Sequence, residues 1–300
     1  MFNYIIYRIG QFIALSLPLK IAYKIAIFVS DLRYFFAARD RRITKENLRA
    51  IFPYKSDREI RRIRIRMFRN FAKYLVDFFR FSKLDLAYTQ ENIRIENKQY
   101  IDEVLSRGKG AITVSAHLGN WELGGVVVAL SGYPFWAVAL PHKYKKVDEF
   151  FNSQREIKGV KVIPLGKAVR QSLDVLKANN VLALVGDRNF SDKGVVLEFF
   201  GRPTVFPQGP AALALKTGAT IIPAFMVRNK GDSFTLRFEK PLDFIPTGNK
   251  DSDIVKLTAQ FKNIFEEYIR KYPEQWYVFR RFWKDNSNED LRNHTDIQRS

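Results

Sequence analysis

The sequence has 300 residues, enough for one large α/β domain, and 46% of them are hydrophobic, which is ample material for a buried core. It contains no cysteine, which excludes disulfides, thiolate metal sites and a cysteine nucleophile. Lysine and arginine number 50 against 31 aspartate and glutamate residues, a formal net charge of +19. Such a chain binds polyanions, and without a zinc-finger, RNA-recognition or helix-turn-helix pattern we do not expect nucleic acid as the partner.

The first 36 residues are apolar but are interrupted by charged residues such as Arg8, Lys20 and Lys24. The longest uncharged run, Ile9 to Leu19, is shorter than the roughly 20 residues that a spanning helix needs. No small-residue cleavage site of a secretory signal follows it. We therefore expect residues 1–36 to form an interfacial or steeply tilted membrane helix. An ordinary amphipathic helix on the surface of the domain is the alternative.

Basic side chains are concentrated at this end, because residues 1–80 hold 18 basic and 6 acidic residues. Residues 40–55 contain Phe52-Pro53, and we expect a turn-rich segment there. From Asp57 to Phe81 apolar residues recur at helical spacing, and five arginines crowd the start of this predicted helix. Its basic face either is solvated or contacts phosphate head groups.

Helices and strands alternate from residue 98 onward, a pattern typical of α/β domains. We expect one domain over residues 37–285 and a polar tail over residues 286–300. Pro223 interrupts the strand predicted over residues 220–228, which indicates an edge or bulge position for it. The predicted helices span 98–106, 121–130, 145–158, 167–178, 208–217 and 252–271, and the predicted strands span 111–115, 134–140, 194–199, 220–228 and 233–239, together with KVIPL and VLALVGD.

The stretch AITVSAHLGNWELGGVVVAL contains a polar junction between a buried strand and a helix. Open α/β sheets bind ligands at the carboxyl ends of their strands, which is where this junction lies. His117 and Glu122 are five residues apart, so they can meet only if His117 precedes the helix. Gly119 permits the required bend, and Asn120 is a suitable N-cap for a helix that starts at Trp121.

In that arrangement Glu122 accepts a ring N–H from His117, fixes its tautomer and leaves the other nitrogen as a base. The alternative interpretation is a capping carboxylate beside a partly buried histidine.

Other polar residues lie at similar places in the predicted fold. Asp187 and Arg188 end the strand VLALVGD at its carboxyl edge, where they form either part of a site or a turn with an ion pair. Arg155 lies on a polar helix, and its planar guanidinium suits a phosphate or a polarised carbonyl unless it faces solvent. Arg202 lies in a rigid turn before a predicted helix start, where an anion can bind.

The pattern H-x-x-x-x-E after a strand resembles the signature of the glycerolipid acyltransferase superfamily, and AHLGNWE resembles its bacterial lipid A branch, the late acyltransferases. Further matches follow in order: Gly186-Asp187, then GVVLEFFGRPTVFPQGPAALALKTGATIIPAF, then PEQWYVFRRFW. The resemblance covers roughly residues 1–285. It implies a glycerol-3-phosphate-acyltransferase-like fold, a central mixed sheet flanked by helices, with a membrane-associated helix before it.

The resemblance also implies a reaction: transfer of a fatty acyl group from acyl carrier protein to a hydroxyl of a lipid A precursor, at the cytoplasmic face of the bacterial inner membrane. His117 and Glu122 are then the catalytic pair, and no cofactor or metal is expected. The anionic membrane and the glycolipid acceptor are the other expected partners. The substrate-binding candidates are Asn120, Arg155, Asp187, Arg188 and Arg202.

Two alternative functions remain at this point. The acceptor can be a phosphatidylinositol mannoside, a glycerophospholipid or another lipid, with acyl-CoA as donor. The protein can instead be a non-catalytic adaptor that binds a membrane surface or nucleic acid through its basic face. The aromatic and basic segment PEQWYVFRRFW suits either a membrane interface or a docking contact.

Overall fold

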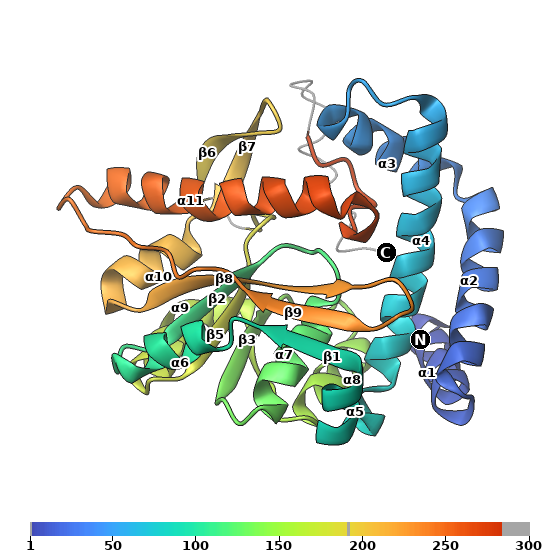
Figure 1. Ribbon diagram of the computed structural model, residues 1–300, viewed down its shortest axis with the longest axis horizontal. Coiled ribbons are helices and arrows are strands. Elements are labelled where there is room, and N and C mark those ends of the chain that lie inside the picture. Colours follow the sequence, from blue (N-terminus) through green and yellow to red (C-terminus); the bar gives the residue numbers. More distant parts are fainter. Residues whose placement is uncertain (1, 191–192, 284–300) are drawn as a thin grey trace.

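In the computed structural model, which describes residues 2–190 and 193–283, a seven-stranded sheet lies between helices on both faces (Figure 1). The strand order is β1-β9-β8-β2-β5-β3-β4, and all neighbours are parallel except β8 and β9. The expected mixed sheet flanked by helices is therefore confirmed. Its strands are β1 (Ile93–Glu96), β2 (Ala111–Ser115), β3 (Phe135–Ala139), β4 (Lys161–Pro164), β5 (Val181–Val185), β8 (Thr220–Arg228) and β9 (Phe234–Phe238).

Two helical layers cover the sheet, and the side chains of β2 show how they divide. Ala111 packs with the helices of one face, whereas Ile112 and Val114 belong to the core on the other, because successive strand residues point to opposite faces. The first layer contains α6 (Gln99–Ser106), α7 (Trp121–Leu130) and α8 (Lys145–Glu156), and the second contains α9 (Ala168–Lys177), α10 (Gly209–Thr217) and α11 (Lys250–Lys271).

Smaller elements complete the domain. A hairpin of β6 (Gly194–Phe199) and β7 (Arg202–Pro207) projects beyond α11 (Figure 1). A short helix, α5 (Leu86–Asn92), leads into β1, and neither it nor β1 and β7 was expected from the sequence. The expected edge position of Pro223 is wrong, because β8 lies between β2 and β9. Pro223 stands just before the antiparallel pairing of β8 with β9 begins.

The N-terminal residues form a helical group at one end of the molecule (Figure 1). The expected single helix over residues 1–36 is wrong: α1 (Phe2–Ser16) and α2 (Leu19–Phe36) are separated at Pro18, which disfavours helical geometry in the residue before it. α3 (Ala38–Ile51) replaces most of the expected turn-rich segment, and α4 (Asp57–Phe79) confirms the predicted basic helix.

Within residues 2–190 and 193–283, no helix combines the length and the apolarity that a bilayer span requires. The predicted polar tail, residues 286–300, lies outside the described residues.

Candidate active site

His117 lies in the loop that joins β2 to α7, and its partner is an aspartate from another strand. The Nδ1 atom of His117 is 2.6 Å from Oδ1 of Asp187, which follows β5. β5 pairs with β2 in parallel, so the two carboxyl ends lie side by side at one edge of the sheet. The predicted position of His117 at a strand end is therefore confirmed, and Asp187 belongs to the same constellation.

Glu122 does not orient His117, which corrects the expected hydrogen bond between them. Both of its carboxylate oxygens accept from Arg155 of α8, at 2.8 Å from Nε and 2.6 Å from Nη2. The bend at Gly119, where φ is +67°, separates His117 from the first turn of α7, and the two side chains have different partners. Arg155 is therefore a partner of Glu122 in a largely buried ion pair.

The buried carboxylate of Asp187 fixes the tautomer of His117. Burial raises the pKa of Asp187, but the charges of His117 and Arg188 and a 3.0 Å hydrogen bond from Trp276 Nε1 outweigh it and hold that pKa below its usual range. Asp187 therefore stays ionised and accepts the Nδ1–H of His117, which leaves Nε2 unprotonated.

Burial also lowers the pKa of His117 itself, although the negative charge of Asp187 opposes this shift. The imidazole is therefore neutral near pH 7 and able to accept a proton. The ring of Trp121 packs edge-on against it, with the ring centroids 5.1 Å apart. Together these contacts hold a neutral imidazole in a fixed orientation, as a general base would require.

Close backbone contacts hold the loop around His117. The amide of Asn120 donates to the carbonyl of Met226 at 2.7 Å, and the amide of Gly119 donates to that of Gln275 at 2.8 Å. On the other side, the amide of Tyr277 donates to the carbonyl of His117 at 3.0 Å. The loop is thus clamped between β8 and the segment that follows α11.

That segment is PEQWYVFRRFW, and its suggested role at a membrane interface is wrong. Trp276, Tyr277 and Val278 are buried in the domain, and Leu118 forms a β-bridge with Trp276. The aromatic residues therefore dock against the His117 loop, the other expected role of the segment.

Asn120 has a structural role in place of the expected contact with substrate. Its Oδ1 accepts from the amide of Leu123 at 3.1 Å, which confirms it as the N-cap of α7. Its Nδ2 donates to Asp77 of α4 at 2.9 Å, and the side chain is buried outside the cavity walls. Asp77 also binds Arg228 at the end of β8 and Tyr23 of α2.

Sequence reasoning missed this buried cluster of Tyr23, Asp77, Asn120 and Arg228. The pattern that could have indicated it is an aspartate inside the apolar run that ends α4, where a charge needs a partner. The cluster ties the N-terminal helices to the start of α7, and hence to the loop that carries His117.

A cavity of about 1480 Å³ opens beside His117, and its walls are mainly apolar. Glu122, Arg155 and Arg188 also line it. Nη2 of Arg188 donates to the carbonyl of Tyr277 at 2.6 Å, and burial lowers the pKa of its guanidinium to about 10. Arg202 does not line the cavity: it is exposed at the start of β7, beside the ring of Trp283, and its expected contact with an anion stays a prediction.

One part of the cavity, the α7 arm, lies on the face of the sheet that α7 covers. Thr113, Ala183 and Ala137 stand side by side on neighbouring strands and form its floor. Gly124 and Gly125 of α7 form part of the opposite wall. These small residues leave space between helix and sheet, with a mainly apolar lining.

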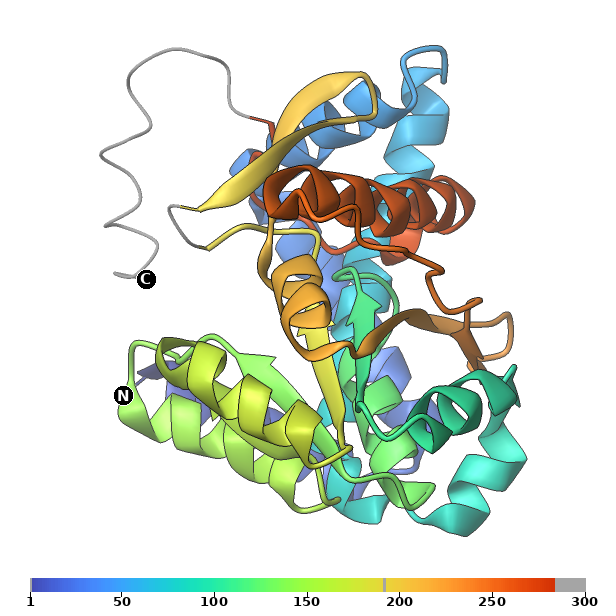
Figure 2. The ribbon, with the colours of Figure 1, turned by 90° about the vertical axis from the view of Figure 1, so that its left-hand side faces the viewer.

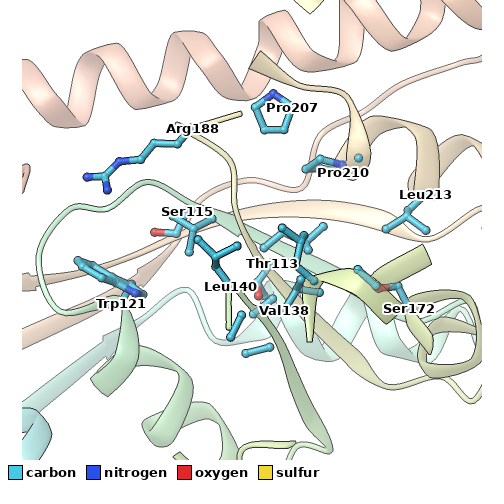
Figure 3. Close-up of a pocket in the computed structure, with 18 of the residues that line it drawn as sticks. Thr113, Ser115, Trp121, Val138, Leu140, Ser172, Arg188, Pro207, Pro210 and Leu213 are labelled. Atoms are coloured by element: carbon cyan, nitrogen blue, oxygen red, sulfur yellow. The ribbon is translucent and has the colours of Figure 1, made fainter. Parts of the chain in front are cut away.

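The other part, the α9 arm, lies on the opposite face, between the sheet, α9 and α10. Val138 and Leu184 line it from the sheet, because they alternate with the residues of the α7 arm. Ser172 of α9 and Leu213 of α10 line it from the helices (Figure 3). In Figure 3 the cavity extends from Trp121 and Ser115 at one side to these two residues at the other.

Among the residues that the structure describes, no group of three or more histidine, aspartate and glutamate side chains is arranged to hold a metal ion.

The model of the bacterial lipid A biosynthesis acyltransferase family matches residues 1–285. A phosphatidylinositol mannoside acyltransferase of Mycolicibacterium smegmatis is 28% identical over 74% of this chain and 73% of its own length. That of Mycobacterium tuberculosis is 27% identical over 74% of this chain and 71% of its own. A lipid A biosynthesis acyltransferase of Haemophilus influenzae is 20% identical over 88% of this chain and 81% of its own. The chain therefore belongs to the bacterial lipid A biosynthesis acyltransferase family and is an acyltransferase.

Proposed function

We propose that this acyltransferase moves a fatty acyl group from a thioester donor to a hydroxyl of a glycolipid, with His117 as the general base. The observation that carries the proposal is the His117–Asp187 pair in the wall of a large apolar cavity. A neutral imidazole with a fixed tautomer can activate a hydroxyl, and an apolar arm beside it can hold a fatty chain.

In the proposed reaction the acceptor hydroxyl gives its proton to Nε2 of His117 while its oxygen attacks the carbonyl carbon of the thioester. Asp187 stabilises the resulting imidazolium. When the tetrahedral intermediate collapses, the C–S bond breaks, and the imidazolium returns the proton to the departing thiolate. The transfer is direct and forms no acyl-enzyme.

The oxyanion of the intermediate needs hydrogen-bond donors near His117. The amide of Leu123 is already bound by its N-cap, Asn120. The amides of Trp121 and Glu122, also in the first turn of α7, are the donors that we assign to the oxyanion.

For the acceptor we propose a lipid A precursor, and for the donor acyl carrier protein, in keeping with the family that matches nearly the whole chain. A phosphatidylinositol mannoside is the second candidate acceptor, because the relatives with that activity share 27–28% identity with this chain, against 20% for the lipid A relative. Both acceptors offer the same chemistry, a hydroxyl on an anionic glycolipid.

We further propose that the protein works at the cytoplasmic face of the inner membrane, held there by α1 and α2. Phe12, Phe28 and Phe35 on these helices are between 70% and 73% exposed. Lys20 and Lys24 are exposed on α2 among them. Exposed aromatic and basic side chains on one helical pair suit an interfacial contact with anionic lipid.

Purified protein given each donor, acyl carrier protein or acyl-CoA thioester, with each acceptor tests the proposal. Mass spectrometry should find the acceptor heavier by one acyl group in at least one pairing. His117→Ala should lower that turnover by a factor of about 10² or more. No acylated product in any pairing, or near-full activity of His117→Ala, would overturn it.

A further inference from the structure

We propose that the α9 arm binds the phosphopantetheine of the donor, with Ser172 as a hydrogen-bond partner and with Lys216 and Lys250 as partners of its phosphate. This inference rests on the proposed function and names the donor side of the same cavity. Acyl carrier protein and coenzyme A both carry the acyl group on phosphopantetheine, so the inference applies to either donor.

The size of the cavity indicates more than one occupant. Pockets for a single small ligand usually measure about 300–1000 Å³, and this cavity measures about 1480 Å³. Its two arms lie on opposite faces of the sheet and meet at the carboxyl edge beside His117. If the acyl chain fills the α7 arm, the thioester lies at His117 and the rest of the donor continues into the α9 arm.

The α9 arm contains a polar atom without a partner. Ser172 is fully buried, and within the described part of the chain its Oγ makes no hydrogen bond. A buried hydroxyl that lacks a partner destabilises the fold, so its presence on an apolar wall points to a ligand that supplies one. A saturated fatty chain has no such atom, whereas pantetheine carries amides and a hydroxyl between apolar segments.

Two cationic side chains, one from α10 and one from α11, also line the cavity. Lys216 is in the last turn of α10 and Lys250 in the first turn of α11, and both line the cavity and are exposed. No ion pair involves either lysine among residues 2–190 and 193–283. Asp253, which also lines the cavity, accepts instead from the amide and hydroxyl of Thr247. Two unpaired ammonium groups there suit a phosphate.

The position of these lysines agrees with a donor that arrives from water. α10 and the start of α11 lie at the end of the molecule opposite α2 in Figure 1, and Figure 2, turned so that this end faces the viewer, shows α10 in front. α2 carries the exposed apolar side chains that we assign to the membrane. A donor carried on a soluble protein can therefore reach the α9 arm without crossing the membrane contact.

The test compares donors that differ only beyond the thioester: acyl carrier protein and acyl-CoA thioesters, which contain phosphopantetheine, and an acyl-N-acetylcysteamine thioester, which lacks the phosphate. Lys216→Ala/Lys250→Ala should raise KM for both full donors by about 10-fold or more, the result of lost ground-state binding. The loss of kcat/KM in this double variant, relative to wild type, should be at least about 10-fold larger with the two full donors than with the N-acetylcysteamine thioester. Lys256→Ala, which removes an exposed lysine of α11 outside the cavity, is the control for the loss of a surface charge.

Ser172→Ala adds a measurement that a purely structural role would not produce. It should raise KM for the full donors several-fold while leaving the midpoint of urea unfolding unchanged or higher, because it removes a buried hydroxyl without a partner. A lower midpoint, or an unchanged KM for both full donors, would overturn the role of Ser172.

The outcomes separate this inference from the proposed function. If wild-type protein transfers from all donors and the lysine variant behaves like Lys256→Ala, the α9 arm does not bind phosphopantetheine although the enzyme assignment stands. An effect confined to acyl-CoA would also overturn it, because that result places the lysines at the nucleotide. If wild-type protein transfers from no donor, the proposed function itself fails.

Discussion

The short contact between His117 Nδ1 and Asp187 Oδ1, at 2.6 Å, joins residues that are 70 positions apart in the chain. It makes Asp187 the group that orients the imidazole of His117, whereas Glu122 pairs with Arg155. The H-x-x-x-x-E spacing therefore marks two neighbouring but separate pairs in this cavity.

Asp187→Asn should reduce kcat by at least about 10²-fold, because a neutral amide neither fixes the tautomer of His117 nor stabilises its imidazolium. The substitution keeps the shape of the side chain, so circular dichroism should show an unchanged fold. Steady-state kinetics with the best donor and acceptor provide the measurement.

Glu122→Gln is the matched control, since it also neutralises one carboxylate of the candidate site. It should lower kcat less than Asp187→Asn does. If Glu122→Gln lost most of the activity while Asp187→Asn retained it, the assignment of Asp187 as the orienting group would be wrong.

The pH dependence of kcat/KM should show an acid limb from His117. Its unprotonated form is active, and burial lowers its pKa below the usual 6.5. Activity should therefore persist at pH 6.5 and disappear only as pH falls through the lower pKa of the folded protein. Initial rates between pH 4.5 and about 8 at subsaturating substrate measure it.

Asp187→Asn should also shift this acid limb, and the direction of the shift is defined. The negative charge of Asp187 raises the pKa of His117, so its removal should move the acid limb of the residual activity to still lower pH. An acid limb above pH 6.5 in wild type, or a shift upward in the variant, would contradict the electrostatic account.

Local patterns predicted the elements that carry the site. α7 begins at Trp121 because Asn120 caps it and Gly119 provides the bend, and both features are visible within six residues of sequence. The partner of His117 depends instead on strand order. β5 comes to lie beside β2 only when the sheet is assembled, and no spacing rule within one motif contains that information.

Helix α3 in the N-terminal region also could not be predicted from its local sequence. Phe52-Pro53 suggested turns over residues 40–55, but α3 continues to Ile51 because Leu48 and Asn47 are buried against the rest of the protein. Nδ2 of Asn47 donates to the carbonyls of Val278 and Arg280, more than 200 residues away. Tertiary contacts of this kind override local turn preference and cannot be read from one segment.

Gly119→Ala should prevent stable folding of the loop that carries His117. A Cβ at this position would stand 1.9 Å from the carbonyl oxygen of Met226, a backbone atom of β8 that cannot move without disturbing the sheet. The positive φ of +67° adds a penalty of about 1–2 kcal/mol for any residue with a Cβ. Urea unfolding should show a loss well beyond that penalty, or no soluble protein.

Gly108→Ala separates the effect of the close contact with β8 from the effect of the positive φ. Its φ of +69° is nearly the same, but a Cβ there would have no atom within 4 Å. It should therefore lose only about 1–2 kcal/mol of unfolding free energy. Equal losses in the two variants would mean that the contact with β8 is not what requires glycine at position 119.

The proposed membrane contact predicts that Phe12→Ser/Phe28→Ser/Phe35→Ser binds anionic vesicles much more weakly than the wild-type protein. These exposed rings supply apolar burial, each worth about 1.5–3 kcal/mol when fully buried. High salt should release only part of the wild-type protein but most of the variant, because basic residues alone would then hold it. Vesicle co-sedimentation at low and high salt measures both effects.

Deleting residues 1–36 is a poorer test of the same contact. It removes Tyr23, whose hydroxyl donates to the buried Asp77, so loss of binding would be confused with loss of fold. The matched control is a triple substitution at exposed residues elsewhere, Tyr54→Ser/Val196→Ser/Ile245→Ser, which should bind vesicles as the wild type does. If both triple variants lost binding equally, or if salt alone released the wild type completely, α1 and α2 would not be an apolar membrane contact.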